Sequence, residues 1–111
     1  MARYASQAEA REKLRQKLDR QPYHIALDGI TLDIARGVYP PDAANSTPML
    51  MQVLREFEPA VALDMGCGSG CLAIHMRRLG AQTVFAADVN WAAVQCARDN
   101  AIRNGFNGWR T

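Results

Sequence analysis

The chain has 111 residues, of which 49% are hydrophobic and 22% charged, and its formal net charge is +2. This composition is typical of a globular domain with one core, and the small net charge argues against nucleic-acid binding through charge alone. Apolar runs stay well below the roughly 18 residues of a membrane span, and the N-terminal segment has no apolar stretch of the secretory type, which predicts a cytoplasmic protein.

The three cysteines, Cys67, Cys71 and Cys96, form neither an even disulfide set nor a CxxC pair. This pattern predicts reduced thiols and no zinc site. We expect Cys67 and Cys71 to be small packing residues, because no base stands near them in the sequence. The two histidines, His24 and His75, have no partner at metal spacing and are expected at the surface.

Residues 1–58 are expected to form an N-terminal helix, a hairpin, a loop and a second helix ahead of the main domain. Residues 5–21 favour a surface helix with a narrow apolar stripe. Residues 23–36 contain two short runs rich in Ile, Leu and Thr on either side of Asp28-Gly29, which is typical of a β-hairpin.

A loop rich in proline and small residues follows the hairpin and leads to a second helix. Thr47 is the expected cap of this helix, with Pro48 at its first position, and the helix is expected to run to about Glu58. Pro59 then ends it.

Residues 59–111 alternate strand and helix patterns. Apolar runs at 60–65 and 83–88 predict strands buried on both faces of a parallel sheet. Helical patterns follow each of them, at 71–80 and 90–105. The predicted fold is therefore α/β with a Rossmann-like parallel sheet, preceded by an N-terminal helix and hairpin.

The segment LDMGCGSG, residues 63–70, joins the first of these strands to its helix. Alternate glycines at such a turn let a ligand approach the backbone, and the helix N-terminus offers amide donors. Asp88 ends the second strand, 22 residues after Gly66, where a carboxylate accepts the hydroxyls of a ribose. Together these features predict a cofactor that contains a nucleoside, although Asp88 could instead only cap the next helix.

The spacing of the turn bears on which cofactor it binds. The dinucleotide pattern GxGxxG has its third glycine three residues after the second, whereas Gly70 follows Gly68 by two. Asp64, two residues before Gly66, would repel a pyrophosphate and favours a cofactor with a positive centre. A nicotinamide-dependent oxidoreductase fragment is the alternative hypothesis.

The stretches LDMGCGSGCLAIHMRRLGA and VFAADVNWAAVQCARDNAIRNG resemble the first two motifs of class I S-adenosylmethionine-dependent methyltransferases. The upstream GVYPPDAANSTPMLMQVL is similar to the loop and helix before the first motif in the small-domain branch, which modifies glutamine side chains or RNA bases. The resemblance covers roughly residues 36 to 108.

The resemblance implies S-adenosylmethionine as the cofactor and assigns a role to each matching position. Asp64 would lie near the methionine amino group and Asp88 would bind the ribose. The other implied cofactor-binding residues are those of the turn, those that flank the adenine and one from the upstream loop: Gly66, Cys67, Gly68, Gly70, Val89, Asn90 and Thr47.

The family fold has seven strands, and its acceptor-side motifs have no counterpart in this chain. Residues 59–111 are therefore expected to be the N-terminal half of the cofactor domain, with unknown catalytic residues. The resemblance leaves three classes of methyl acceptor open: an RNA base, a protein glutamine or a small molecule. Alternatively the chain is a non-catalytic module completed by a partner chain.

A two-stranded piece of sheet also leaves strand edges and apolar side chains poorly covered, at Val61, Leu63, Val84 and Phe85. We expect marginal stability, self-association or pairing with a partner chain.

Overall fold

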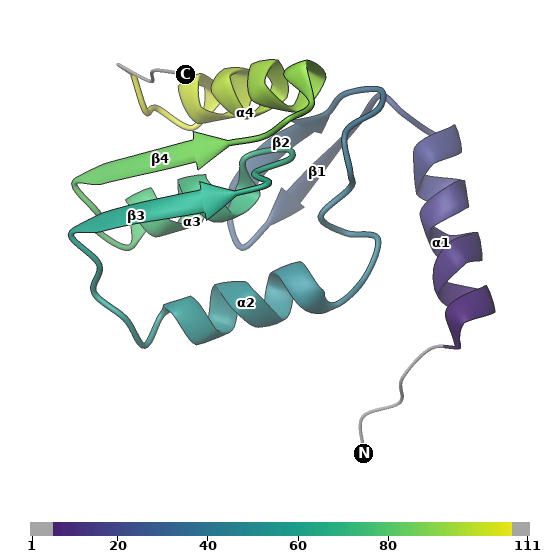
Figure 1. Ribbon diagram of the computed structural model, residues 1–111, viewed down its shortest axis with the longest axis horizontal. Coiled ribbons are helices and arrows are strands. Elements are labelled where there is room, and N and C mark those ends of the chain that lie inside the picture. The colour runs from purple at the N-terminus through teal and green to yellow at the C-terminus, as the bar shows by residue number, and fades with distance from the viewer. Residues whose placement is uncertain (1–5, 108–111) are drawn as a thin grey trace.

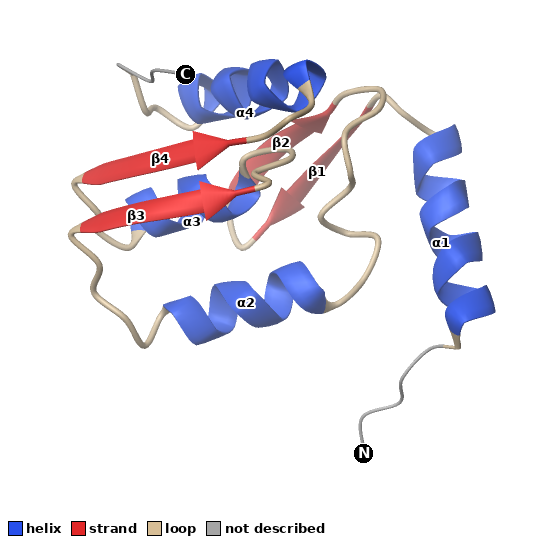
Figure 2. Ribbon diagram, viewed as in Figure 1, coloured by secondary structure: helices blue, strands red, loops and turns tan. Residues whose placement is uncertain are grey.

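The computed structural model describes residues 6–107. Helices and strands alternate as an α/β fold expects (Figures 1 and 2). In chain order the elements are α1 (Gln7–Asp19), β1 (Tyr23–Leu27), β2 (Ile30–Ile34), α2 (Ser46–Leu54), β3 (Val61–Met65), α3 (Cys71–Arg78), β4 (Thr83–Ala87) and α4 (Trp91–Arg103). None of the described helices is long and apolar enough to cross a membrane.

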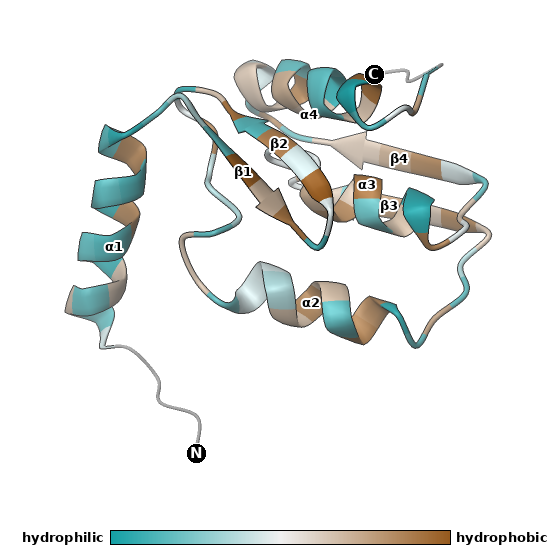
Figure 3. Ribbon diagram, turned by 180° about the vertical axis from the view of Figure 1, so that it is seen from behind, coloured by the Kyte–Doolittle hydropathy of each residue, from teal (hydrophilic) through white to brown (hydrophobic). Residues whose placement is uncertain are grey.

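The predicted hairpin is confirmed: β1 and β2 pair antiparallel, from Tyr23 opposite Ile34 to Leu27 opposite Ile30. Asp28 and Gly29 both have positive φ, 51° and 79°, as a two-residue turn of this hand requires. The inward side chains of β2 are fully buried and form the centre of the main core with Ile74 of α3. The hairpin thus packs against the helices rather than against the parallel sheet, as the rear view shows (Figure 3).

The predicted parallel pair is also confirmed. β3 and β4 run side by side in register, from Val61 beside Thr83 to Met65 beside Ala87, and α3 connects them. One face of this pair packs on α3, where Ala62 of β3 and Ala73 and Ile74 of α3 are buried. The carboxyl ends of both strands meet at one edge, beside the loop that follows the hairpin (Figure 1).

The other face of the parallel pair is open in the described part of the chain. Val61, Leu63, Met65 and Phe85 are 59–73% exposed there. The prediction that both strands are buried on both faces is therefore wrong for residues 6–107, because no described element covers this side (Figure 1). The expected exposure of Val61, Leu63 and Phe85 is confirmed, whereas Val84 is half-buried, since it points to the same side as Ala62.

The predicted first helix is confirmed as α1, and it has no buried residue. Its apolar stripe stays at the surface, with Leu14 half-buried and Leu18 41% exposed. Lys17 joins α1 to the loop after the hairpin through an ion pair of 2.9 Å with Asp42. α1 lies at the periphery of the molecule in both views (Figures 1 and 3).

Helix α2 corrects two expectations. Its cap residue is Asn45, and Thr47 lies inside the first turn, so the predicted Thr47 cap is wrong. Pro48 lies at the third helical position, two later than expected, and is accommodated there because the first amides of a helix have no intrahelical acceptor. The helix ends at Leu54 rather than near Glu58, and the amides of residues 55–57 instead bond to carbonyls three residues back.

Helices α3 and α4 match the predicted patterns, and α4 is capped as predicted by Asn90, whose side chain accepts the Ala92 amide at 3.0 Å. The expectation for His75 on α3 is wrong. This residue is 3% exposed, and its ring Nε2 lies 2.7 Å from the Met51 carbonyl oxygen of α2. The sequence did not reveal this burial, because only the packing of α2 on α3 removes His75 from water.

A substitution at Gly70 would test how closely α4 approaches the turn before α3. Its φ is +86°, and a Cβ there would lie 2.9 Å from Ala97 Cα. We expect Gly70→Ala to lower the free energy of unfolding by about 2 to 5 kcal/mol, because backbone strain and overlap add. Gly105→Ala is the control, since Gly105 also has φ +86° but open space around it, and should lose only about 1 to 2 kcal/mol. Equal losses in urea unfolding would contradict the close approach.

The open face of the parallel pair generates a second prediction. We expect the chain to associate with itself in a concentration-dependent way, because Leu63 and Phe85 form a contiguous apolar surface with their neighbours. Replacing Leu63 or Phe85 by lysine should shift the sedimentation coefficient toward the monomer value. Gln82→Lys adds the same charge at an exposed site outside the strand and should leave association unchanged. A monomer at every concentration would refute the expectation.

Candidate cofactor pocket

The glycine turn, residues 66–70, lies at the carboxyl end of β3 and bends around the end of β4. The amides of Gly66 and Cys67 both donate to the Ala87 carbonyl oxygen, at 2.8 and 2.9 Å. Gly66, Gly68 and Gly70 all have positive φ, between 53° and 86°, which side chains disfavour. The glycines are therefore needed for the path of the backbone itself.

Asp88 joins the end of β4 to this turn. Its Oδ2 accepts the Gly68 amide at 3.0 Å and its Oδ1 accepts the Asn90 amide at 2.9 Å. The side-chain cap of α4 is Asn90. A carboxylate has about four acceptor positions, so these two bonds leave capacity for hydroxyl donors.

Asp64 is the second carboxylate at this edge, and it is electrostatically unsatisfied. Burial raises the pKa of its carboxyl group above the ordinary value, and the nearby Asp88 charge adds to the shift, while a hydrogen bond with the Ala73 backbone opposes it. Its Oδ2 is buried without a hydrogen-bond partner among the described residues. A buried carboxylate oxygen of this kind is costly unless a donor or a positive group approaches it.

These groups meet in a pocket of about 290 Å³. Its walls come from the loop after the hairpin, the start of α2, the glycine turn with the start of α3, and the start of α4. The lining residues are Gly37, Tyr39, Pro41, Thr47, Asp64, Gly66, Cys67, Gly68, Ser69, Cys71, Leu72, Asp88, Asn90 and Ala93.

Seven sequence-predicted residues line this pocket: Thr47, Asp64, Gly66, Cys67, Gly68, Asp88 and Asn90. Two others do not. Gly70 instead provides the close contact with Ala97 of α4, and Val89 is fully exposed beside the pocket. The structure thus gathers most of the candidate set at one sheet edge.

Gly37, Tyr39 and Pro41 also line the pocket and were not predicted as site residues, because the sequence indicated only a loop there. Asn90 Nδ2 donates to the Gly37 carbonyl oxygen at 3.0 Å, and Gln21 Oε1 accepts the Gly37 amide at 3.0 Å. The cluster of glycine and prolines at residues 37–41 was the available signal. It did not indicate which side of the glycine turn the loop would approach.

The cysteines near the pocket are weak nucleophiles. Burial raises the pKa of the Cys67 thiol to about 11 and that of Cys71 to about 12. Both thiols are therefore protonated at neutral pH, in keeping with a packing role. Within residues 6–107, no group of three or more His, Cys, Asp or Glu side chains is arranged to hold a metal ion.

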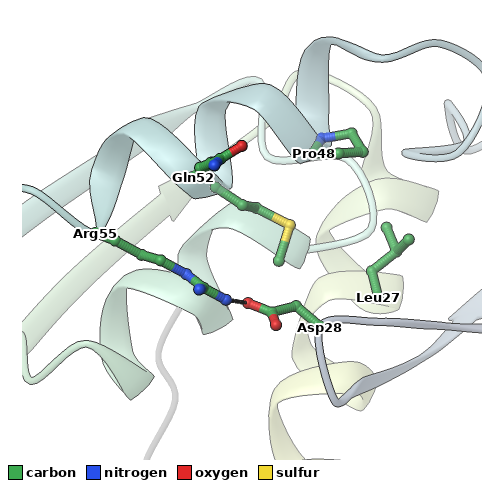
Figure 4. A pocket seen from close by; sticks show the side chains of 6 residues that line it. Leu27, Asp28, Pro48, Gln52 and Arg55 are labelled. Atoms are coloured by element: carbon green, nitrogen blue, oxygen red, sulfur yellow. Dashed lines mark hydrogen bonds and ion pairs between the residues drawn. The ribbon is translucent and has the colours of Figure 1, made fainter.

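A second pocket, of about 280 Å³, lies between the hairpin turn and α2 (Figure 4). Asp28 and Arg55 form an ion pair across it and remain 43% and 52% exposed. None of its lining residues belongs to the first pocket: they are Leu27, Asp28, Pro48, Met51, Gln52 and Arg55. An exposed pair of this kind contributes little free energy, and the pocket contains none of the predicted site residues.

The chain is similar to curated ribosomal protein L11 methyltransferases. The chain is 45% identical over 71 residues to the ribosomal protein L11 methyltransferase of Allorhizobium ampelinum, covering 61% of this chain and 24% of that protein. It is 44% identical over 64 residues to the one from Caldanaerobacter subterraneus subsp. tengcongensis, covering 56% and 21%. It is 54% identical over 45 residues to the one from Photobacterium profundum, covering 40% and 15%.

The chain thus spans a quarter or less of the length of these curated relatives. A family model described as ribosomal protein L11 methyltransferase (PrmA) matches residues 44–110. This range includes Thr47 at the start of α2, the glycine turn and Asp88. Because this match spans more than half of the chain, the chain belongs to the ribosomal protein L11 methyltransferase family.

Proposed function

We propose that this chain supplies the S-adenosylmethionine-binding part of a methyltransferase whose acceptor is ribosomal protein L11. The observation that carries the cofactor proposal is the buried Oδ2 of Asp64, which has no partner among the described residues and lines the pocket beside the glycine turn. The family membership supports the same cofactor class, and the printed name of the relatives supports the acceptor.

The residues present suit the chemical groups of this cofactor. Asp64 would pair with the positive amino group of the methionine part, and Asp88 has free acceptor positions for the two ribose hydroxyls. Gly66, Gly68 and Cys67 would line the cofactor with backbone, while Asn90 and the exposed Val89 would flank the adenine. Thr47 would contact it from α2.

When bound, S-adenosylmethionine supplies a methyl group on a positively charged sulfur. The contribution of this chain to the reaction is to hold and orient that donor, because methyl transfer depends mainly on the alignment of donor and acceptor. The thiols of Cys67 and Cys71 are protonated and take no part.

A nicotinamide cofactor is the second candidate from the sequence, and the pocket disfavours it. Asp64 and Asp88 both line the cavity, and their charges would oppose a pyrophosphate. Tighter binding of NADH than of S-adenosylmethionine would reverse this preference.

The acceptor is tested with the complete polypeptide whose reading frame contains this chain. We expect it to transfer a tritiated methyl group from S-adenosylmethionine to purified ribosomal protein L11, and not to ribosomal RNA or to a release factor. Label in RNA or in the release factor alone would overturn the acceptor proposal while leaving the cofactor proposal intact. Binding of S-adenosylmethionine without transfer to any of the three would favour a non-catalytic module.

Asp88 generates the first cofactor prediction. We expect Asp88→Ala to weaken S-adenosylmethionine binding by roughly 10-fold to 100-fold, because it removes charged acceptors for the ribose and frees the Gly68 amide. Calorimetric titration of the chain measures this change. Asp99→Asn, on the exposed side of α4, is the control and should leave the dissociation constant unchanged. Equal affinities for the two variants would contradict the proposed role.

Asp64 generates a prediction with opposite effects on stability and binding. Its raised pKa means that ionisation costs folding free energy, so this cost is absent below the unfolded pKa and grows as the pH rises through the folded pKa. At neutral pH, Asp64→Asn should therefore increase the free energy of unfolding. It should also weaken S-adenosylmethionine binding.

The affinity of the unmodified chain should rise with pH through the raised pKa of Asp64 and then level off, because the positive cofactor favours the ionised carboxylate. Asp64→Asn should lose this pH dependence. Urea unfolding and calorimetry at several pH values check both parts. A variant that is less stable and binds as tightly as the original would refute the assignment.

A further inference from the structure

Asn100 of α4 connects two segments that lie far apart in the sequence. Its side chain is 0% exposed, and its Oδ1 accepts the Asp33 amide at 2.8 Å. Its Nδ2 donates to the Asp33 carbonyl oxygen at 3.0 Å and to the Ser69 carbonyl oxygen at 2.8 Å. One buried amide therefore holds β2 and the glycine turn at a set separation.

Each of these segments leads to a different wall of the cofactor pocket. Ser69 lies in the turn between Gly68, whose amide Asp88 accepts, and Gly70, which touches Ala97 of α4. Ser69 itself is 3% exposed and lines the pocket. Asn100 thus adds to the Ala87, Asp88 and Ala97 contacts by which β4 and α4 hold this turn.

On the other side, the chain runs from Asp33 along the last residues of β2 into the loop that contains Gly37 and Tyr39. This loop approaches the turn closely, because a Cβ on Gly68 would lie 3.7 Å from the Tyr39 carbonyl oxygen. Val38, between the two lining residues, is fully buried and packs with Ala93 and Cys96 of α4. The separation of Asp33 from Ser69 therefore acts, together with the Val38 contacts on α4, on the separation of the loop from the turn.

We infer that Asn100 is a positioning residue for the cofactor: it sets the spacing between the glycine turn and the loop after β2, and so the width of the pocket between them. The identity of the bound ligand rests on the proposed function above, whereas the spacing itself rests only on the contacts of Asn100. A primary amide suits this role because it offers one acceptor and two donors, which match the Asp33 amide and the two carbonyl oxygens.

Asn104, one helical turn later, provides a matched control. Its Oδ1 accepts the Thr31 amide at 3.2 Å and its Nδ2 donates to the Thr31 carbonyl oxygen at 2.9 Å. It therefore binds β2 in the same way as Asn100 does, and its Nδ2 also donates to the Asn100 backbone carbonyl oxygen at 2.8 Å, but among the described residues it makes no bond to the glycine turn. A residue that only fastened the hairpin to α4 would behave like Asn104.

The first experiment compares Asn100→Leu with Asn104→Leu in the chain. Without ligand, Asn100→Leu should shift the backbone amide resonances of both walls, at Gly68, Ser69, Gly37 and Tyr39, whereas Asn104→Leu should shift only those near Thr31. With S-adenosylmethionine, Asn100→Leu should weaken binding at least about 10-fold more than Asn104→Leu, at temperatures where both variants are fully folded. Equal shifts and equal affinities would overturn the inference.

Asn100→Asp adds a second variant of nearly the same shape. The ionised carboxylate has no donor and would face the Asp33 and Ser69 carbonyl oxygens, so we expect it to weaken binding at least as strongly as Asn100→Leu. Affinity equal to that of the unmodified chain would also overturn the inference.

A second experiment uses the unmodified chain and does not depend on the folding of any variant. The Nδ2 protons of Asn100 should exchange slowly with solvent without ligand, and titration with S-adenosylmethionine should shift their resonances while leaving those of Asn104 in place. Fast exchange would overturn the inference. If S-adenosylmethionine does not bind at all, the proposed function fails, and the exchange rate together with the ligand-free shifts still decides the role of Asn100.

Discussion

The close approach of α4 to the glycine turn is the contact on which the pocket depends. Ala97 occupies the place where a side chain at residue 70 would stand, so the turn and the helix meet backbone to backbone. That contact brings Asn100, three residues further along α4, within hydrogen-bonding distance of Ser69. It also fixes the start of α4, where Asn90 bonds to the loop at Gly37. The absence of a Cβ at residue 70 thus allows the glycine turn and α4 to lie together at this sheet edge.

Two carboxylates share this edge but differ in how well they are satisfied. Asp88 is ordered by two backbone amides, whereas Asp64 is held in a buried position with one oxygen unpaired among the described residues. Burial and the neighbouring charge raise the pKa of Asp64, so the ionised form of this carboxyl group is disfavoured at this edge. A positive group beside it would stabilise the ionised form, which supports the proposal of a cationic cofactor.

The two faces of the parallel pair show how far the described residues complete the fold. Helix α3 buries one face, with Ala62 of β3 against it, while Leu63 and Phe85 remain exposed on the other. The relatives are at least about four times longer than the matched segment. The pocket and the proposed cofactor-binding groups thus lie in a segment whose described residues leave an apolar sheet face uncovered.

The local elements and the chemistry of the glycine turn could be predicted from the residues alone. Short, nearly continuous apolar runs located both strands of the parallel pair, and the spacing of Asp64, the glycines and Asp88 predicted the residues of one sheet edge, because the ends of parallel strands lie together. Which side chains lose water and which segments face each other depends on contacts between distant parts of the chain. His75 is buried by α2, Tyr39 lines the pocket and Asn100 bonds to the glycine turn, all through contacts across long stretches of chain. Such contacts follow from helix packing in three dimensions, for which a local pattern of residue types carries no signal.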